Sequence, residues 1–202
     1  MAGRIVVLIS GSGSNMDALA EACESGEVPG EVVAALSDRE CSGLGLAQAR
    51  GIPTKVLEPK GFPDRETWSD ALRSEVLAHD PDLVVSAGFM RILSPVFVDA
   101  FEGKLINLHP ALLPAFPGAH AVRDALEAGA TETGSTVHFV DREVDHGPTI
   151  LQEPVPIEQD DTEESLHTRI KAVEHRMLPQ ACRLLLEGKV RLAGDEVTIT
   201  EA

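Results

Sequence analysis

The chain has 202 residues, of which 33 are acidic and 17 basic, and its formal net charge at pH 7 is −16. So acidic a chain is poorly suited to nucleic acid or an anionic membrane, and we expect neither as a partner. Its three cysteines lack the paired spacing of a zinc site or a disulfide framework, which favours a cytoplasmic location. No stretch reaches the roughly eighteen apolar residues that a membrane span requires.

The first half of the chain alternates short β-rich runs with helical segments. Strands are predicted at residues 5–9, 32–36, 54–57, 83–86 and 104–109. Helices are predicted between them, at residues 14–23, 42–50, 63–79 and 95–100. This alternation is typical of parallel β-α-β units, so we expect an α/β fold with a Rossmann-like, doubly wound, mostly parallel sheet and helices on both faces. The length suits one domain, residues 1–202.

The pattern changes in the second half. A loop over residues 110–120 and a short helix over residues 122–127 precede two extended segments, 134–140 and 149–157, which surround a turn. Because side chains alternate along a strand, residues 136, 138 and 140 are expected to share one face.

The carboxyl-terminal part begins with a long amphipathic helix that runs from about residue 163 to about residue 187. Asp161 or Thr162 is the expected N-cap, and acidic residues occupy the first turn. A terminal hairpin is predicted over residues 190–200, interrupted by Gly194 and Asp195.

A glycine- and serine-rich segment, residues 10–15, joins the first strand to the first helix. Its glycines allow a sharp turn, and the free N–H groups at the start of the helix favour a phosphate group. The segment is neither a GxGxxG nor a Walker A sequence, so an ordinary loop between strand and helix is the alternative.

A second segment, residues 88–93, follows the strand 83–86 at what should be the same edge of the sheet. Its apolar residues suit a pocket for a flat ring whose edge is bound by backbone groups. Plain packing of the loop is the alternative.

Asn107 and His109 lie at the end of a buried strand and point to the same side of it, because side chains alternate. Pro110 should end the strand and leave both at its carboxyl end, where open α/β sheets bind ligands. Each residue alone has a structural explanation, as has the turn of Asp145, His146 and Gly147. Together the amide, imidazole and carboxylate suit the transfer of an acyl group and a proton.

Four segments carry a resemblance to the glycinamide ribonucleotide formyltransferase family: residues 9–15, 87–95, 107–114, and 137–140 with Asp145. The resemblance runs from Arg4 to about Pro179 and includes Glu174 with His175. It implies transfer of the formyl group of 10-formyltetrahydrofolate to the amine of 5'-phosphoribosylglycinamide, in purine biosynthesis. No metal is required by this reaction, and a homodimer is left open.

The resemblance also implies roles for individual residues. The catalytic residues would be Asn107, His109 and Asp145. The ribonucleotide would bind to Gly13, Ser14, Asn15 and Glu174. The folate would bind to Arg65, Met90, Arg91, Ile92, Leu93, Asn107, Asp141, Arg142, Glu143, Val144 and Asp145. Residues 1–100 would then form a nucleotide-binding half, and residues 101–202 a catalytic and folate-binding half.

His146 and Val122 depart from the family pattern, which often has Gly at the first position and sometimes a second His at the other. A formyltetrahydrofolate hydrolase would use the same amide, imidazole and carboxylate but give the formyl group to water. A methionyl-tRNA formyltransferase shares the formyl-folate core, although the acidic chain argues against tRNA. A non-catalytic nucleotide-binding module is the alternative from another functional class.

Overall fold

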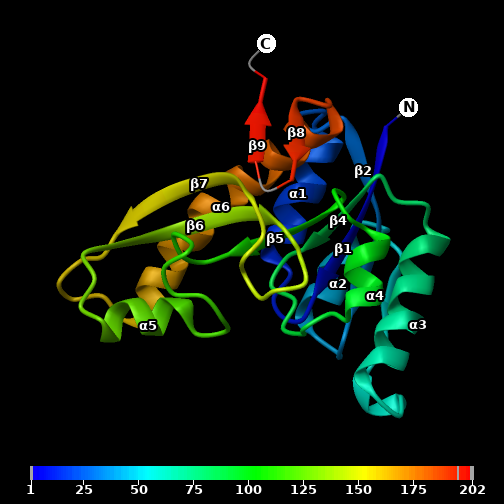
Figure 1. The fold of residues 1–202 in the computed structure, drawn as a ribbon, viewed down its shortest axis with the longest axis horizontal. Coiled ribbons are helices and arrows are strands. Elements are labelled where there is room, and N and C mark those ends of the chain that lie inside the picture. The colour runs from blue at the N-terminus through cyan, green and yellow to red at the C-terminus, as the bar shows by residue number, and fades with distance from the viewer. Residues whose placement is uncertain (1, 195, 201–202) are drawn as a thin grey trace.

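The computed structural model describes residues 2–194 and 196–200. Its main feature is a seven-stranded sheet in the order β3-β2-β1-β4-β5-β6-β7 (Figure 1). The strands are β1 (Gly3–Ile9), β2 (Gly30–Ser37), β3 (Thr54–Val56), β4 (Leu83–Ser86), β5 (Leu105–His109), β6 (Glu132–Phe139) and β7 (Thr149–Pro156). Strands β1 to β5 are parallel, and β6 and β7 are antiparallel to their neighbours. The expected mostly parallel sheet is confirmed.

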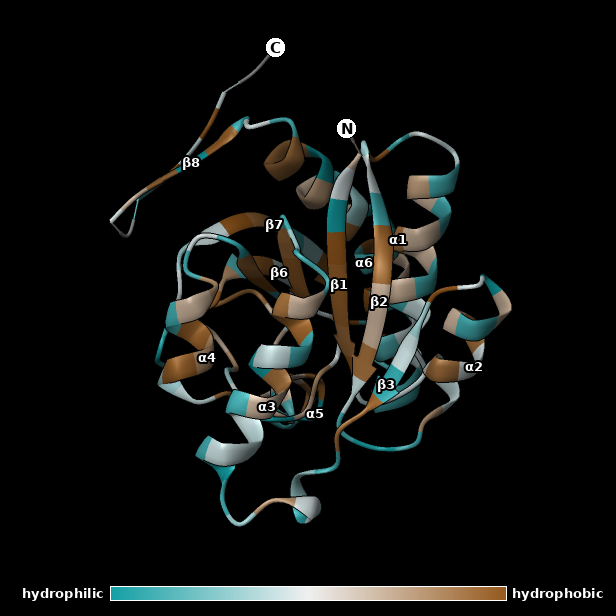
Figure 2. Ribbon diagram, turned by 90° about the vertical axis from the view of Figure 1, so that its right-hand side faces the viewer, coloured by the Kyte–Doolittle hydropathy of each residue, from teal (hydrophilic) through white to brown (hydrophobic). Residues whose placement is uncertain are grey.

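Helices cover both faces of the sheet, as expected for a doubly wound fold. They are α1 (Ser14–Glu24), α2 (Ser42–Ala49), α3 (Arg65–Ala78), α4 (Pro95–Ala100), α5 (Ala121–Glu127) and α6 (Glu163–Leu186). Helices α1, α2 and α6 pack on one face, and α3 and α4 pack on the other. Figure 2 shows β1 and β2 between these two groups of helices. A short 3-10 helix, η1 (Pro59–Gly61), precedes α3 and was not expected.

The core follows from the uniformly apolar sequence of β1. Residues 5–9 of this strand are fully buried. Ile5, Val7 and Ile9 belong to the core cluster beneath α1, α2 and α6. Val6 and Leu8 face the opposite cluster, which contains Trp68 of α3 and Phe97 of α4. A strand buried on both faces reads as a continuous apolar run, in agreement with the position of β1 inside the sheet between β2 and β4.

The second half of the chain has the predicted order of elements. Strands β6 and β7 pair antiparallel around the 140–148 segment. A separate hairpin is formed by β8 (Val190–Ala193) and β9 (Glu196–Ile199). The Asp195 part of its predicted interruption lies outside the described residues. No helix in the described part of the chain is long and apolar enough to cross a membrane.

Thr162, rather than Asp161, is the N-cap of α6. Its hydroxyl accepts a hydrogen bond from the Ser165 backbone N–H, and the Ser165 hydroxyl accepts one from the Thr162 backbone N–H. Asp161 instead pairs with Arg169, about two turns further along the helix. Both reciprocal bonds of a capping box are therefore present at the start of this helix.

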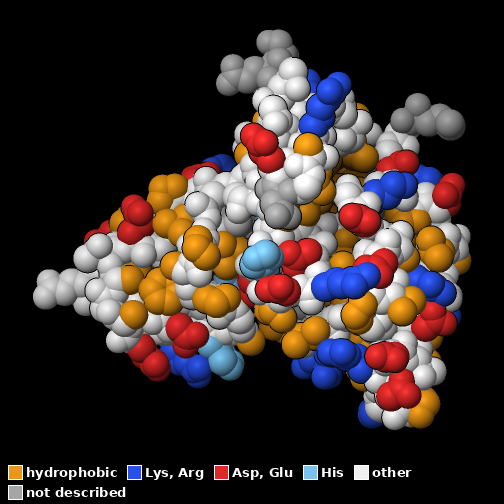
Figure 3. Space-filling view, in the orientation of Figure 1, with side chains coloured by type: hydrophobic (Ala, Val, Ile, Leu, Met, Phe, Trp, Pro, Cys, Tyr) orange, Lys and Arg blue, Asp and Glu red, His pale blue; other side chains and the backbone are white. Residues whose placement is uncertain are grey.

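The order of the strands determines where a ligand binds. The chain leaves β1 toward β2 on one side and returns to β4 on the other, so the sheet has a switch point between β1 and β4. The loops that follow β1, β2, β4 and β5 all leave from the carboxyl ends of parallel strands. Acidic and basic side chains are interspersed on the face drawn in Figure 3, so the net negative charge is not gathered there into one anionic patch.

Candidate functional site

The loop after β1 presents the start of helix α1. Gly13 is the N-cap, with a φ of 73° in the left-handed region, and it has no side chain with which to cap the helix. The first N–H groups of α1 are thus left for another acceptor. This arrangement suits a phosphate, since backbone N–H groups and the helix dipole both favour an anion there.

Gly43 of α2 fixes the shape of this loop through close backbone contact. A Cβ atom on Gly43 would lie 2.8 Å from the Gly13 Cα and 2.9 Å from the Gly11 carbonyl oxygen. The Gly43 N–H also donates to that carbonyl oxygen, at 3.0 Å. Sequence reasoning missed this residue. The signal available was a glycine in the first turn of a helix, where most other residues favour the helix more.

Glu174 of α6 contacts the first turn of α1 through Asn15. The Asn15 Nδ2 donates to its carboxylate at 2.8 Å, and the Ser135 hydroxyl lies 3.4 Å from the second carboxylate oxygen. Burial raises the pKa of Glu174 above its usual value, although both hydrogen bonds oppose the shift. The Asn15 Oδ1 is buried with no hydrogen-bond partner among the described residues. Asn15 and Glu174, both predicted to bind the ribonucleotide, are therefore in contact, and the Asn15 Oδ1 is available to accept a further hydrogen bond.

Asn107 and His109 project from one face of β5, as the alternation of the strand predicted. Their neighbours across the antiparallel ladder are His138 and Thr136 of β6. The Asn107 Nδ2 lies 3.2 Å from the His138 Nε2 and 3.5 Å from the Asp145 Oδ1. The predicted amide, imidazole and carboxylate are thus brought together.

His109 is almost fully buried, and both of its ring nitrogens face oxygen acceptors. Its Nε2 donates to the Phe116 carbonyl oxygen at 2.8 Å, because a carbonyl can only accept. Its Nδ1 lies 3.4 Å from the Asp145 Oδ2. The imidazole thus lies between two oxygen acceptors, a carbonyl and a carboxylate.

His138 was not among the predicted site residues, although it contacts two of them. Its Nδ1 donates to the Phe139 carbonyl oxygen at 2.8 Å, so the Nε2 of the neutral ring bears a lone pair. Burial lowers the pKa of His138 and favours that neutral form. The lone pair can accept only from the amino side of the Asn107 amide, which sets the orientation of this amide. The alternation along β6 placed His138 on a defined face, but only pairing with β5 shows what that face meets.

Asp145 receives its position from an unusual backbone conformation. Its φ is 54°, in the left-handed region, and its Oδ2 accepts from the Gly118 N–H at 2.7 Å. Nearby, Gly147 packs so closely against the Phe139 carbonyl that no Cβ would fit. Arg142 ties the segment to α4 by donating twice to Asp99, and the His146–Asp141 pair links two residues within the segment.

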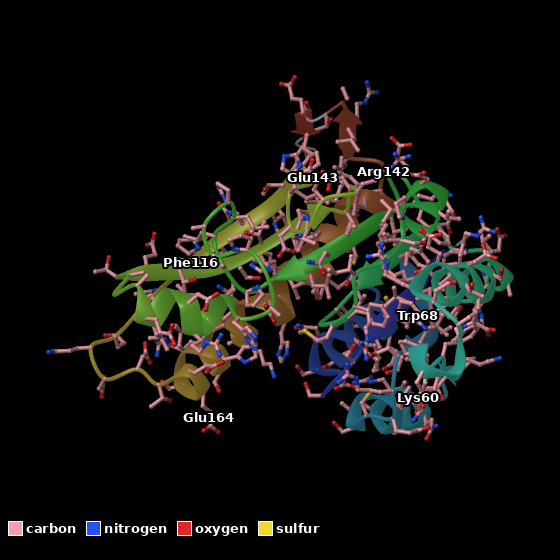
Figure 4. The ribbon with its side chains drawn as sticks, turned by 60° about the horizontal axis from the view of Figure 1, so that its bottom comes forward. Lys60, Trp68, Phe116, Arg142, Glu143 and Glu164 are labelled. Atoms are coloured by element: carbon pink, nitrogen blue, oxygen red, sulfur yellow. The ribbon has the colours of Figure 1, made fainter. Side chains whose placement is uncertain are left out.

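A cavity of about 620 Å³ lies beside the carboxyl end of β4. Four of the predicted folate residues line it: Arg65, Met90, Arg91 and Ile92. The lining also includes Trp68 and Lys60, which Figure 4 labels in the same part of the molecule. Met90 and Ile92 are each 58 % exposed, an unusual fraction for large apolar side chains. Apolar side chains open to a cavity suit a flat ring, as the sequence predicted.

The remaining predicted folate residues lie outside this cavity, in two different places. Leu93 is partly buried against the core cluster beneath α3 and α4. Residues 141–145 do not line this cavity but carry Asp145 into the catalytic group. Figure 4 shows Arg142 and Glu143 of this segment away from Trp68 and Lys60. In the described residues, no group of three or more His, Cys, Asp or Glu side chains is arranged to hold a metal ion.

Comparison with known proteins gives a consistent result. The formyl transferase family model matches residues 3–182. The chain is 46 % identical to phosphoribosylglycinamide formyltransferase of Mycobacterium tuberculosis over 97 % of this chain and 91 % of that protein. Glycinamide ribonucleotide transformylase 1 from Symbiobacterium toebii is 44 % identical, with a TM-score of 0.96, over 98 % of this chain and 94 % of that one.

A formyltetrahydrofolate deformylase from Pseudomonas syringae is also similar, with a TM-score of 0.92. It is 26 % identical, and the match covers 100 % of this chain but 67 % of that one.

Proposed function

The chain belongs to the formyl transferase family, and on that premise we propose that it is a folate-dependent phosphoribosylglycinamide formyltransferase. It transfers the formyl group of 10-formyltetrahydrofolate to the amine of 5'-phosphoribosylglycinamide, a step of purine biosynthesis. The observation that carries this proposal is the meeting of Asn107, His109 and Asp145 at the carboxyl ends of the strands. A protein that only bound nucleotides would have no use for such a group.

The ribonucleotide binds at the loop after β1. Its phosphate accepts hydrogen bonds from the backbone of Gly13, Ser14 and Asn15 at the uncapped start of α1. Glu174 and the unpaired Asn15 Oδ1 are left to contact the ribose or glycinamide portion. Because the chain as a whole is acidic, these local donors must supply the attraction for an anion.

The folate binds in the cavity beside β4 and against the segment that carries Asp145. The apolar side chains of Met90, Ile92 and Leu93 contact its ring, and backbone groups of the loop bind the ring edge. Arg65 has no carboxylate partner among the described residues and lines the cavity, so it is available to a carboxylate of the ligand. Residues 141–145 complete the site on the catalytic side.

The reaction makes one bond and breaks another. The substrate amine nitrogen bonds to the formyl carbon, the bond from that carbon to N10 of the folate breaks, and a proton passes from the amine to N10. The Asn107 amide keeps its contact with His138 and turns its other N–H, which lies 3.5 Å from Asp145, to the oxyanion that develops on the formyl oxygen. His109 stabilises the same charge and delivers a proton, and Asp145 orients the imidazole through its contact with Nδ1.

Transfer to the ribonucleotide is favoured over hydrolysis by the comparisons. The chain is much less similar to the deformylase than to the transformylase, and it covers two thirds of the former. We also propose that the protein acts in the cytoplasm, which its three free cysteines support.

The test is to follow the absorbance change as 10-formyltetrahydrofolate loses its formyl group, with and without phosphoribosylglycinamide. Turnover that depends on the ribonucleotide is the expected result. Equal turnover without it would instead identify a hydrolase, and no turnover in either mixture would contradict the proposal.

A further inference from the structure

Asp38, which immediately follows β2, is a buried carboxylate that the proposed reaction does not use. Its side chain has no exposed surface, yet it accepts hydrogen bonds from three residues. The Ser10 hydroxyl donates to Oδ1 at 2.6 Å, and the Arg91 Nε donates to Oδ2 at 2.7 Å. Arg39, the next residue in the chain, donates from Nε and from one terminal nitrogen.

Ser10 makes a second contact that closes a ring of interactions. Its hydroxyl oxygen accepts from the Met90 backbone N–H at 2.9 Å while its proton goes to Asp38. The path from Met90 through Ser10 and Asp38 to Arg91 therefore holds two consecutive residues of the 88–93 loop. This loop otherwise extends from the end of β4 with Met90 and Ile92 largely exposed.

The charges agree with this geometry. Burial by itself raises the pKa of Asp38, but the hydrogen bonds from Arg39, Ser10 and Arg91 outweigh it and hold the pKa below its usual value. Asp38 is thus ionised when it pairs with Arg91. The Arg91 guanidinium is engaged with a residue of the protein rather than left for a ligand.

We propose that Asp38, acting with Ser10, is a positioning residue that sets the backbone of the 88–93 loop and thereby the affinity for the formyl folate. The inference rests on the proposed function, because that function assigns this loop to the folate. Asp38 touches neither substrate in this scheme. It acts only through Ser10 and Arg91, so its loss should weaken folate binding and leave the ribonucleotide loop and the catalytic group in place.

Arg39 provides a matched control. It pairs with the same carboxylate, and its side chain is 47 % exposed against 42 % for Arg91. Unlike Arg91, it belongs to the segment that carries Asp38 and does not reach the 88–93 loop. An effect that came from the charge around Asp38 alone would follow loss of either arginine.

The experiment compares Asp38→Asn, Ser10→Ala and Arg39→Gln with the unchanged protein. Asparagine keeps an acceptor for Ser10 and removes the charge that pairs with Arg91. Folate affinity is read directly from the fluorescence of Trp68, the single tryptophan, which lines the cavity and stacks on Phe89 at 6.2 Å between centroids. The probe is 10-formyltetrahydrofolate, titrated without the ribonucleotide.

We expect Asp38→Asn to raise the Kd and KM for the folate about tenfold, or about 1.4 kcal/mol, while kcat and the ribonucleotide KM change less than about twofold. Ser10→Ala should also raise the folate Kd, since it removes both contacts of the hydroxyl. Arg39→Gln should leave the folate Kd within about twofold of its original value. The double variant of Asp38 and Ser10 should lose less than the sum of the two single losses.

Equal increases in both KM values, or an unchanged folate Kd with a lowered Tm, would show a merely structural role and overturn the inference. An effect of Arg39→Gln as large as that of Asp38→Asn would overturn it as well. The fluorescence titration needs no turnover, so the effect of Asp38 on folate binding is measured even if the ribonucleotide proves not to be the acceptor.

Discussion

The loop that starts α1 and the group around Asp145 lie at the same edge of the sheet but are held in different ways. The first is fixed by backbone packed against backbone, where Gly13 and Gly43 leave no room for a Cβ. The second is fixed by side-chain contacts that Asn107 and His109 of β5 make with Asp145, from a segment distant in the sequence. The loop should therefore be sensitive to added volume, and the catalytic group to lost donors and acceptors of unchanged volume.

The largest effect is expected when a catalytic side chain is replaced by one of similar shape that cannot donate a hydrogen bond. Asn107→Leu removes the amide donor with little change in volume, so turnover should fall about 10²- to 10³-fold, as for loss of an oxyanion donor. Steady-state kinetics with a separate measurement of ribonucleotide binding would check this. A loss of binding as large as the loss of turnover would refute the catalytic role of Asn107.

A single added methyl group should break the loop that starts α1. Gly43→Ala pushes the helix away from Gly13 and should raise the ribonucleotide KM at least about tenfold, because misplacement by about 1 Å is costly in a binding site. Gly45→Ala, in the same helix, meets nothing within 4 Å and is the control. It should leave KM unchanged and stabilise the protein by about 0.5 to 1 kcal/mol. Similar KM values for the two variants would rule out the packing argument.

The smallest effect is expected on the pH dependence of stability, from Glu174, which contacts Asn15 of α1 and Ser135 of β6. Burial raises its pKa in the folded protein, so the folded state binds the proton more tightly than the unfolded state does. Stability should then decrease as the pH rises from the usual value of 4.5 through the folded-state pKa. Glu174→Gln should therefore raise the Tm at pH 8 and lose this advantage near pH 4. Thermal unfolding across this range is the measurement, and a constant difference would contradict the assignment.

Local patterns were sufficient to predict most of the fold. The apolar run of β1, the alternation in β5 and the stop at Pro110 depend on neighbouring residues, and the structure confirms them. The antiparallel pairing of β5 with β6 depends on contacts distant in sequence, and it determines that His138 faces Asn107. This explains why Asn107 was recognised and His138 was not.

The Asp38 network was missed for the same reason. Ser10 and Met90 are 80 residues apart, and only the neighbouring positions of β1 and β4 bring them together. The predicted division into a nucleotide-binding half and a folate-binding half stays a prediction. However, the cavity assigned to the folate is lined only by residues 59–92, from the first half of the chain.

The Phe116 carbonyl, which accepts from the His109 Nε2, has a consequence for selectivity between ground state and transition state. Phe116 holds this carbonyl in place with a φ of 54°, uncommon for a residue with a bulky side chain. A substrate oxygen that binds the His109 Nε2 must displace this carbonyl. A neutral formyl oxygen gains little by the exchange, because one carbonyl replaces another. An oxyanion forms a hydrogen bond about twice as strong, so the imidazole favours the oxygen only once charge has developed on it.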